Sequence, residues 1–297
     1  MSSSVTEGGS GVTVTAGTTV GADDGRLAEA AGPAEALAAD AAAEHGVQVR
    51  TLDDPSEHRV AAAVLQRIWS YPEGVPMPPE MLRAFAYTGN YVGAAYDGAQ
   101  MVGVATAFRT NHNALHSHIA GVLPSHQGRS IGYVLKLHQR AWALRRGIGH
   151  IGWTFDPLIR RNAHFNLIKL GAGVADYLAD FYGGMTDRIN AGDHSDRLLV
   201  EWDLLGPVPG APVEPGPGAV AVLRVGPDGG PVVQRGSDTD RVLMLPPDAE
   251  ALRDADPVLS SRWRAALRSV LTDALSDGHR IVGLDVGSAY VTRKELP

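Results

Sequence analysis

The residues of this chain that could do chemistry begin with a glycine-containing loop, GVLPSHQGRSIG, at 121–132. An apolar strand is predicted to end there, a proline turn follows, and residues 127–132 open a long predicted helix. Such a loop leaves the first N–H groups of the helix without partners, and the positive end of the helix dipole adds to them. The sequence therefore predicts a site for a phosphate or pyrophosphate.

Two histidines precede this loop on the predicted strand. Strand alternation places His116 and His118 on one face together with Ala120 and Val122. Imidazole transfers protons near neutral pH, so either histidine could be a catalytic base, and we favour His118 because it is nearer the end of the strand. Two hydrogen-bonded, half-buried sheet histidines are an equally good interpretation.

The same histidines could instead bind a metal together with His112, because a His-x-His pair on a strand points two imidazoles the same way. No carboxylate lies near them in the sequence. We therefore expect no metal site.

Asp156 and Pro157 follow the next predicted strand, at the strand end where ligands gather in open α/β sheets. Asp156 could orient a substrate amine or a histidine, or it could be the N-cap of a helix predicted over 158–170, with Pro157 at the first position. Arg160 and Arg161 oppose the dipole in the first turn of this helix, which hints at an anionic partner, although a solvated surface is the commoner explanation.

Composition limits the class of protein. The chain has 297 residues, 44% hydrophobic, with a net charge of −7 and no cysteine. This is enough for a sizeable core and for one large or two small domains, and the acidic balance argues against a nucleic-acid partner. The absence of cysteine excludes disulfides and thiolate chemistry. We see no signal peptide and no apolar run that would span a membrane, so we expect a cytoplasmic protein.

Periodicity and turn residues predict a mixed α/β domain over 47–205, with the order β-αα-βββ-α-β-α-ββ. Residues 1–46 are predicted to be disordered or an Ala-rich helix, and residues 206–218, rich in proline and glycine, are predicted to be a linker. A small α+β extension is predicted over 219–297. The predicted strands lie at 47–52, 91–96, 101–109, 115–123, 151–155, 174–181 and 197–204, then at 219–225, 231–234, 241–245, 281–286 and 289–292, and the predicted helices at 55–69, 79–87, 130–146, 158–170 and 260–276.

The loop at 127–132, preceded by VLPSH, resembles the acyl-CoA signature of the GCN5-related N-acetyltransferase (GNAT) superfamily, which reads Gln/Arg-x-x-Gly-x-Gly/Ala. The first and last positions match, and Ser130 replaces the middle glycine. This replacement is tolerable if Ser130 has a negative φ, because serine is a good helix N-cap. Asn162, Ala163 and the segment 169–172 resemble a later helix of the family. The segments WTFDPLIRRNAHFNLIKLGA and LHSHIAGVLP are similar to an uncharacterised branch with a C-terminal extension.

The resemblance implies a GNAT-like mixed central sheet flanked by helices, with acetyl-CoA or another acyl-CoA as co-substrate. It implies that a backbone N–H of Val122 or Leu123 stabilises the thioester carbonyl, and that Asn162 and Asn166 contact the pantetheine amides. The pyrophosphate would rest on the N–H groups of Gln127, Gly128, Arg129, Ser130, Ile131 and Gly132.

The leaving thiolate needs a proton, which the family often takes from a tyrosine on the later helix. Leu167 stands at that position here, so the acid could be Tyr182 or Tyr177, or the thiolate could leave unassisted.

The sequence therefore predicts an N-acyltransferase that moves an acyl group, acetyl by default and succinyl as an option, to a primary amine of a small molecule by direct attack. The alternatives are a non-catalytic CoA- or metabolite-binding module and a metal enzyme built on the histidine cluster. We expect no membrane or nucleic-acid partner, a homodimer is an option, and the C-terminal extension would cover or complete the acceptor side.

Overall fold

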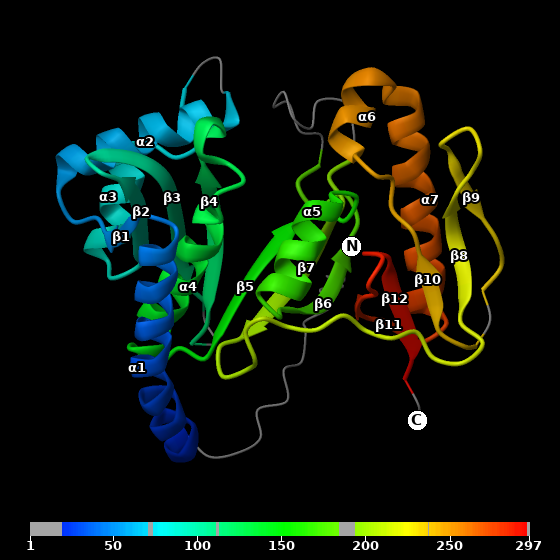
Figure 1. Cartoon of the computed structure of the whole chain (residues 1–297), viewed down its shortest axis with the longest axis horizontal. Coiled ribbons are helices and arrows are strands. Elements are labelled where there is room, and N and C mark those ends of the chain that lie inside the picture. Colours follow the sequence, from blue (N-terminus) through cyan, green and yellow to red (C-terminus); the bar gives the residue numbers. More distant parts are fainter. Residues whose placement is uncertain (1–19, 71–73, 111–112, 184–193, 237, 296–297) are drawn as a thin grey trace, which may run out of the picture.

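The computed structural model describes residues 20–70, 74–110, 113–183, 194–236 and 238–295, which contain two sheets (Figure 1). The first has the strand order β1-β2-β3-β4-β5-β7-β6 and the second β11-β12-β10-β8-β9. The first sheet is antiparallel except for the pair β4–β5, and the second contains one parallel pair, β8–β10. The predicted fold class, a mixed α/β domain with a C-terminal α+β extension, is confirmed. In the described residues, no helix is long and apolar enough to cross a membrane.

The strands of the first sheet are β1 (Gln48–Thr51), β2 (Tyr91–Asp97), β3 (Gln100–Arg109), β4 (Leu115–Val122), β5 (His150–Phe155), β6 (Gly173–Leu178) and β7 (Arg197–Asp203). Its helices are α1 (Val20–Glu44), α2 (Pro55–Trp69), α3 (Pro79–Tyr87), α4 (Ile131–Leu144) and α5 (Arg160–Ala163), which continues as a π-helical segment (His164–Lys169). The C-terminal part comprises β8 (Val220–Val225), β9 (Pro231–Val233), β10 (Arg241–Leu243), α6 (Ala249–Ala255), α7 (Pro257–Ser276), β11 (His279–Leu284) and β12 (Tyr290–Lys294).

Two differences from the predicted elements concern the site. The helix predicted over 158–170 begins only at Arg160 and changes to π-helix at His164. Helix α6 was not predicted, because it is short and most of its surface is polar.

The strands β4 and β5 separate soon after they start. They pair at only two positions, Leu115 with Ile151 and His116 with Gly152, and then diverge although β4 runs on to Val122 and β5 to Phe155 (Figure 1). Beyond these pairs, neither strand satisfies the other's backbone groups, so the space between them needs another partner.

A β-bulge interrupts β4 just after this point. Ser117 pairs with Ala107 of β3 and Ile119 pairs with Thr106, so His118 is the extra residue. A bulge leaves one residue out of the ladder and shifts the alternation of faces along the strand. As a result Val122 packs toward α4, while a side chain at Gly121 would meet Ile68 and Trp69 of α2. The predicted common face of His116, His118, Ala120 and Val122 is therefore wrong at its C-terminal end.

Helices cover both faces of the first sheet. On one face α4 buries an apolar stripe, and α1 packs along α4 through small side chains such as Ala34, Ala38 and Ala41. Of the two options for the N-terminal segment, residues 20–44 adopt the helix, whereas 1–19 lie outside the described residues. On the other face, α2 and α3 close a second core around Leu65 and Leu82.

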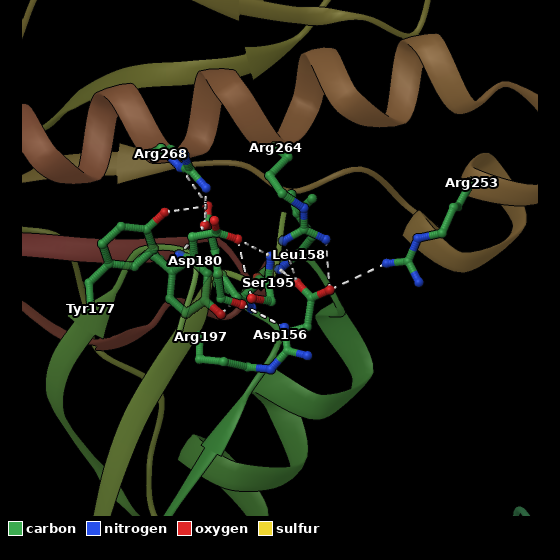
Figure 2. Close-up of polar contacts among 12 residues, drawn as sticks. Asp156, Leu158, Tyr177, Asp180, Ser195, Arg197, Arg253, Arg264 and Arg268 are labelled. Atoms are coloured by element: carbon green, nitrogen blue, oxygen red, sulfur yellow. Dashed lines mark hydrogen bonds and ion pairs between the residues drawn. The ribbon is translucent and has the colours of Figure 1, made fainter. Parts of the chain in front are cut away.

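The C-terminal part docks on the first sheet through ion pairs to two aspartates. Arg264 of α7 binds both carboxylate oxygens of Asp156, at 3.0 and 2.8 Å, and Arg253 of α6 reaches the same carboxylate at 3.3 Å (Figure 2). Arg268 pairs in the same way with Asp196, which also accepts a hydrogen bond from Tyr177 at 2.6 Å. Burial would raise the pKa of Asp196, but the bonds from Arg268 and Tyr177 outweigh it and lower the pKa.

The predicted linker, 206–218, has no regular secondary structure, but hydrogen bonds hold it at several points. Gly210 donates its N–H to the carbonyl of Ile168 at 2.8 Å, and Val213 donates to Leu284 at 2.7 Å. The connection is thus attached to both parts of the chain, which argues for a fixed arrangement of the two sheets.

Replacing Arg264 with methionine is expected to lower the free energy of unfolding by about 3 kcal/mol, because Asp156 stays buried with one weaker partner. Denaturant unfolding measures the change. The matched control is Arg280→Met, since Arg280 and Glu295 form an exposed pair, and its effect should stay below about 1 kcal/mol. Equal losses in the two variants would contradict the docking role of Arg264.

Candidate functional site

A pocket of about 790 Å³ opens between the loop after β4 and the helical segment after β5. One wall consists of Val122, His126, Gln127, Gly128, Ser130, Ile131, Gly132 and Tyr133, and the other of Arg160, Arg161, Asn162, His164, Phe165 and Lys169. Pro247 and Ser288 of the C-terminal part complete the lining. The pocket therefore lies at the open end of the separation between β4 and β5.

The loop at the start of α4 offers free backbone donors. The carbonyl of Ser130 accepts the N–H groups of Tyr133 at 2.9 Å and Val134 at 3.1 Å. Within the described part of the chain, the N–H groups of 128–132 have no hydrogen-bond partner. Consecutive free amides at a helix N-terminus bind anions, so the predicted phosphate site has the donors it needs.

Ser130 does not take the conformation expected from the sequence. Its φ is 57°, in the left-handed region, and its side chain makes no capping hydrogen bond. The chain runs extended through Gln127 and then turns at Gly128, with φ 79°, so it needs a second left-handed residue to enter α4. Ser130 is the N-cap residue of α4, but the condition of a negative φ is not met and the side chain does not cap the helix. Glycine would fit this position without strain.

Three predicted CoA-binding residues do not line the pocket. The side chain of Arg129 pairs with Asp97 at 2.7 Å, and this contact lowers the pKa of Asp97. Leu123 is buried and donates its N–H to the carbonyl of Val102 at 2.8 Å, so it cannot also bind a thioester carbonyl. Asn166 is buried, and its side-chain oxygen accepts the indole N–H of Trp153 at 3.1 Å.

The oxyanion donor predicted at Val122, which lines the pocket, stays a prediction, and the bulge of β4 offers further candidates. The irregularity of β4 lies at His118, upstream of Val122 and Leu123. The backbone groups that the bulge and the departing β5 leave unpaired are therefore found near His118, deeper between the strands than the sequence suggested.

His116 and His118 share the face of the sheet opposite α4. Both rings lie against Phe108, with centroid distances of 5.1 and 6.0 Å, and Phe108 contacts Phe85 of α3. Desolvation lowers the pKa of both histidines, and for His116 the nearby His118 and Lys136 lower it further. The lowered pKa favours the neutral imidazole of His118 near pH 7, and the side chain remains exposed on this face, where a substrate can reach it.

Asp156 does not have the role predicted at the site. Its carboxylate is held by Arg264 and Arg253, and the same group accepts the N–H of Leu158 at 3.0 Å. It is not the N-cap of α5, which is Ile159. The sequence could not indicate these arginines, because they lie about a hundred residues further along the chain.

The two tyrosines proposed as acids lie outside the pocket lining. The hydroxyl of Tyr182 is 3.2 Å from that of Thr154, and its ring lies beside the guanidinium of Arg197. The hydroxyl of Tyr177 donates to Asp196, and burial together with this bond raises its pKa. The proton of Tyr177 is therefore committed to Asp196, and the hydroxyl of Tyr182 contacts Thr154 outside the lining.

Several lining residues were missed by the sequence analysis. Tyr133 follows the loop on α4, and His164 and Phe165 occupy the π-helical turn, which periodicity did not reveal. The guanidinium of Arg160 donates to the carbonyl of Gly287 at 2.7 Å, so the C-terminal part is joined to the pocket wall.

The described residues contain no group of three or more histidine, aspartate or glutamate side chains placed to hold a metal ion. His112, which the metal alternative required, lies outside the described residues.

Comparisons with known proteins identify the first domain. Residues 60–165 match the model of the acetyltransferase (GNAT) family, a stretch that contains β4, the loop, α4, β5 and α5. The resemblance to the GNAT superfamily predicted from the sequence is thus confirmed over residues 60–165, which form a GNAT acetyltransferase domain. A search of curated proteins found no match.

Similar solved structures are GNAT acetyltransferases that span about half of this chain. A putative acetyltransferase from Desulfovibrio desulfuricans has 19% identity over 53% of this chain and 99% of its own, with a TM-score of 0.44. The putative acetyltransferase yncA from Salmonella typhimurium, solved with acetyl-CoA, has 16% identity over 54% and 94%, with a TM-score of 0.44. The ribosomal-protein-S18-alanine N-acetyltransferase from Escherichia coli has 14% identity over 53% and 94%, with a TM-score of 0.43.

The left-handed conformation of Ser130 gives a direct prediction. Ser130→Gly should raise the free energy of unfolding by about 1 kcal/mol, because glycine adopts a positive φ without the side-chain clash. The control is Ser125→Gly in the same loop, outside the positive-φ residues, where added backbone freedom should destabilise. Chemical denaturation compares the two. A loss of stability in Ser130→Gly similar to that in Ser125→Gly would contradict the loop conformation.

Proposed function

We propose that this protein is an N-acyltransferase that moves an acyl group from acyl-CoA to a primary amine of a small molecule. One observation carries the proposal: a row of free amides at the start of α4 opens onto the gap between β4 and β5. Coenzyme A has a pyrophosphate at one end of a long pantetheine arm and a thiol at the other. The row of amides suits the pyrophosphate, and the gap suits the arm.

The side chains on the wall opposite the loop support the same ligand. Arg160, Arg161 and Lys169 line the wall opposite the loop, so basic groups face a pocket that would receive several phosphate charges. Arg161 is paired with Glu250 at 2.8 Å and Arg160 with a carbonyl, whereas the exposed Lys169 lines the pocket beside them. The amide of Asn162 adds a neutral hydrogen-bonding group for the pantetheine arm.

The chemistry needs a base and an oxyanion donor where the two strands part. The attacking amine must lose a proton, and a neutral His118 on the open face of the sheet is suited to accept it. The unpaired backbone of the bulge is suited to stabilise the charge that develops on the thioester oxygen. His116, one position before the bulge, is the second candidate base.

A second function, a CoA-binding module without catalysis, is favoured by one observation. Leu167 replaces the usual acid, and Asp156, Tyr177 and Tyr182 are engaged elsewhere. Binding and turnover separate the two functions.

The first test measures thermal stability with acetyl-CoA, succinyl-CoA and CoA, then thiol release with a panel of small amines. A ligand at a hundred times its Kd should stabilise the protein by about 2.7 kcal/mol. Stabilisation with amine-dependent thiol release supports the enzyme, and stabilisation without release for any amine supports the binding module. The absence of stabilisation by all three ligands would overturn both functions.

The role of His118 gives a pH prediction. The imidazole must be neutral to act as a base, so kcat should rise with pH on the acidic side, through the pKa of His118, which lies below the usual 6.5. His118→Gln should lower kcat by about 10²–10⁴-fold and remove this acidic limb, with acyl-CoA affinity retained. His150→Gln, at the exposed start of β5, is the control. An unchanged kcat and pH profile in His118→Gln would exclude His118 as the base.

A further inference from the structure

Lys136 is a buried cation in the middle of α4. Its exposed fraction is 4%, whereas the other two lysines, Lys169 and Lys294, are exposed. The ammonium donates to the hydroxyl of Ser117 at 2.8 Å and to the side-chain oxygen of Gln139 at 3.2 Å, and it lies 3.7 Å from the centre of the Trp153 ring. Within the described residues, no carboxylate forms an ion pair with it.

The position of this ammonium is determined by the separation of the strands. The last pair between β4 and β5 is His116 with Gly152, so Ser117 and Trp153 are the first residues of each strand beyond it. Lys136 contacts both of them. Its amine therefore bridges the two strands from the α4 side where they part, while His118 is on the opposite face.

A buried unpaired cation is costly, and nothing in the packing requires one, because an apolar chain of the same length would fill the space. Burial lowers the pKa of Lys136 to about 7, so the amine can give up and regain a proton near neutral pH. The titratable group of β4 that this charge affects is His116, on the opposite face of the sheet, and Lys136 lowers its pKa. Perturbed groups of this kind are found preferentially at functional sites.

The proposed reaction still needs a proton donor for the leaving thiolate, and this lysine can supply one. A leaving thiolate requires a proton or a positive charge, and Leu167, Tyr177 and Asp156 are unable to provide either. The ammonium has three N–H donors, and two of them bind the oxygens of Ser117 and Gln139, so one N–H remains for another acceptor.

We propose that Lys136 is the general acid that protonates the departing CoA thiolate. The inference rests on the proposed acyltransferase function. The bond from the amine nitrogen to the acyl carbon forms, the carbon–sulfur bond breaks, and its electron pair passes to sulfur. Sulfur takes a proton from Nζ of Lys136, the amine gives its proton to His118, and both side chains re-equilibrate with solvent after products leave.

The binary complex with CoA tests this without an acceptor amine. A nearby ammonium stabilises a thiolate, so the thiol of bound CoA should titrate below the value of about 8.5 typical of a free thiol, and Lys136→Met should raise it. Ultraviolet absorbance of the thiolate follows the titration, with desulfo-CoA as the blank. Lys294→Met is the matched control, because Lys294 lies on β12 of the second sheet, where it pairs with Asp238.

Kinetics provide the second readout. In the wild type, kcat should fall as pH rises through about 7, because the acid must be protonated. Lys136→Met should lower kcat by about 10²-fold or more with the KM for acyl-CoA little changed, and it should lose this basic limb. Ser117→Ala, a milder change, removes a hydrogen bond to the charged amine and should move the limb to lower pH.

The outcomes are distinct. Bound CoA whose thiol titrates alike in the wild type and Lys136→Met would overturn the role of Lys136 and leave the acyltransferase proposal standing. Failure of the wild type to bind CoA would overturn the acyltransferase proposal, and the role of Lys136 with it. A basic limb unmoved by Ser117→Ala would also contradict Lys136 as the acid.

Discussion

The separation of β4 from β5 after two paired positions is the constraint on which the rest of the structure depends. Two adjacent strands that part leave backbone donors and acceptors without a ladder, and these groups need a partner. Two features lie at the point of separation: Lys136 of α4 contacts both strands from one face, and the bulge at His118 lies within β4 itself. The loop before α4 lies where β4 and β5 are furthest apart, and its free backbone amides can bind a phosphate there.

The C-terminal part stabilises the region of the sheet next to the separation of β4 and β5. Its arginines bind Asp156, directly after β5, and Asp196, directly before β7. These ion pairs attach the C-terminal part to the strands β5, β7 and β6 of the first sheet. The carbonyl of Gly287 binds Arg160, and Ser288 lines the pocket. A domain held by buried ion pairs defines one rim of the pocket, which is consistent with a fixed site.

Much of this fold could be predicted from the sequence, because apolar periodicity and turn residues gave β4, α4 and β5 within a few residues of their ends. The loop was found for the same reason, since glycine and a helix start are both local signals. The bulge could not be found, because one extra residue leaves the alternation of His116 and His118 intact and changes the face only beyond them. The φ of Ser130 depends on the path of the loop, which residue type alone does not reveal.

Other errors came from contacts that are distant in sequence. Asp156 has the local pattern of a cap or a catalytic carboxylate, and only folding brings Arg264 to it. Lys136 was not singled out in the sequence, and its burial became visible only beside Trp153. The sequence thus predicted which ligand is bound better than it predicted which residues would act on that ligand.

The most direct test is a crystal structure of the protein with acetyl-CoA. We expect the pyrophosphate on the N–H groups of 128–132, the pantetheine arm between β4 and β5, and the sulfur beside Lys136 and the bulge at His118. A CoA molecule bound with its pyrophosphate away from the loop, or with its thioester outside the gap between the two strands, would contradict this arrangement.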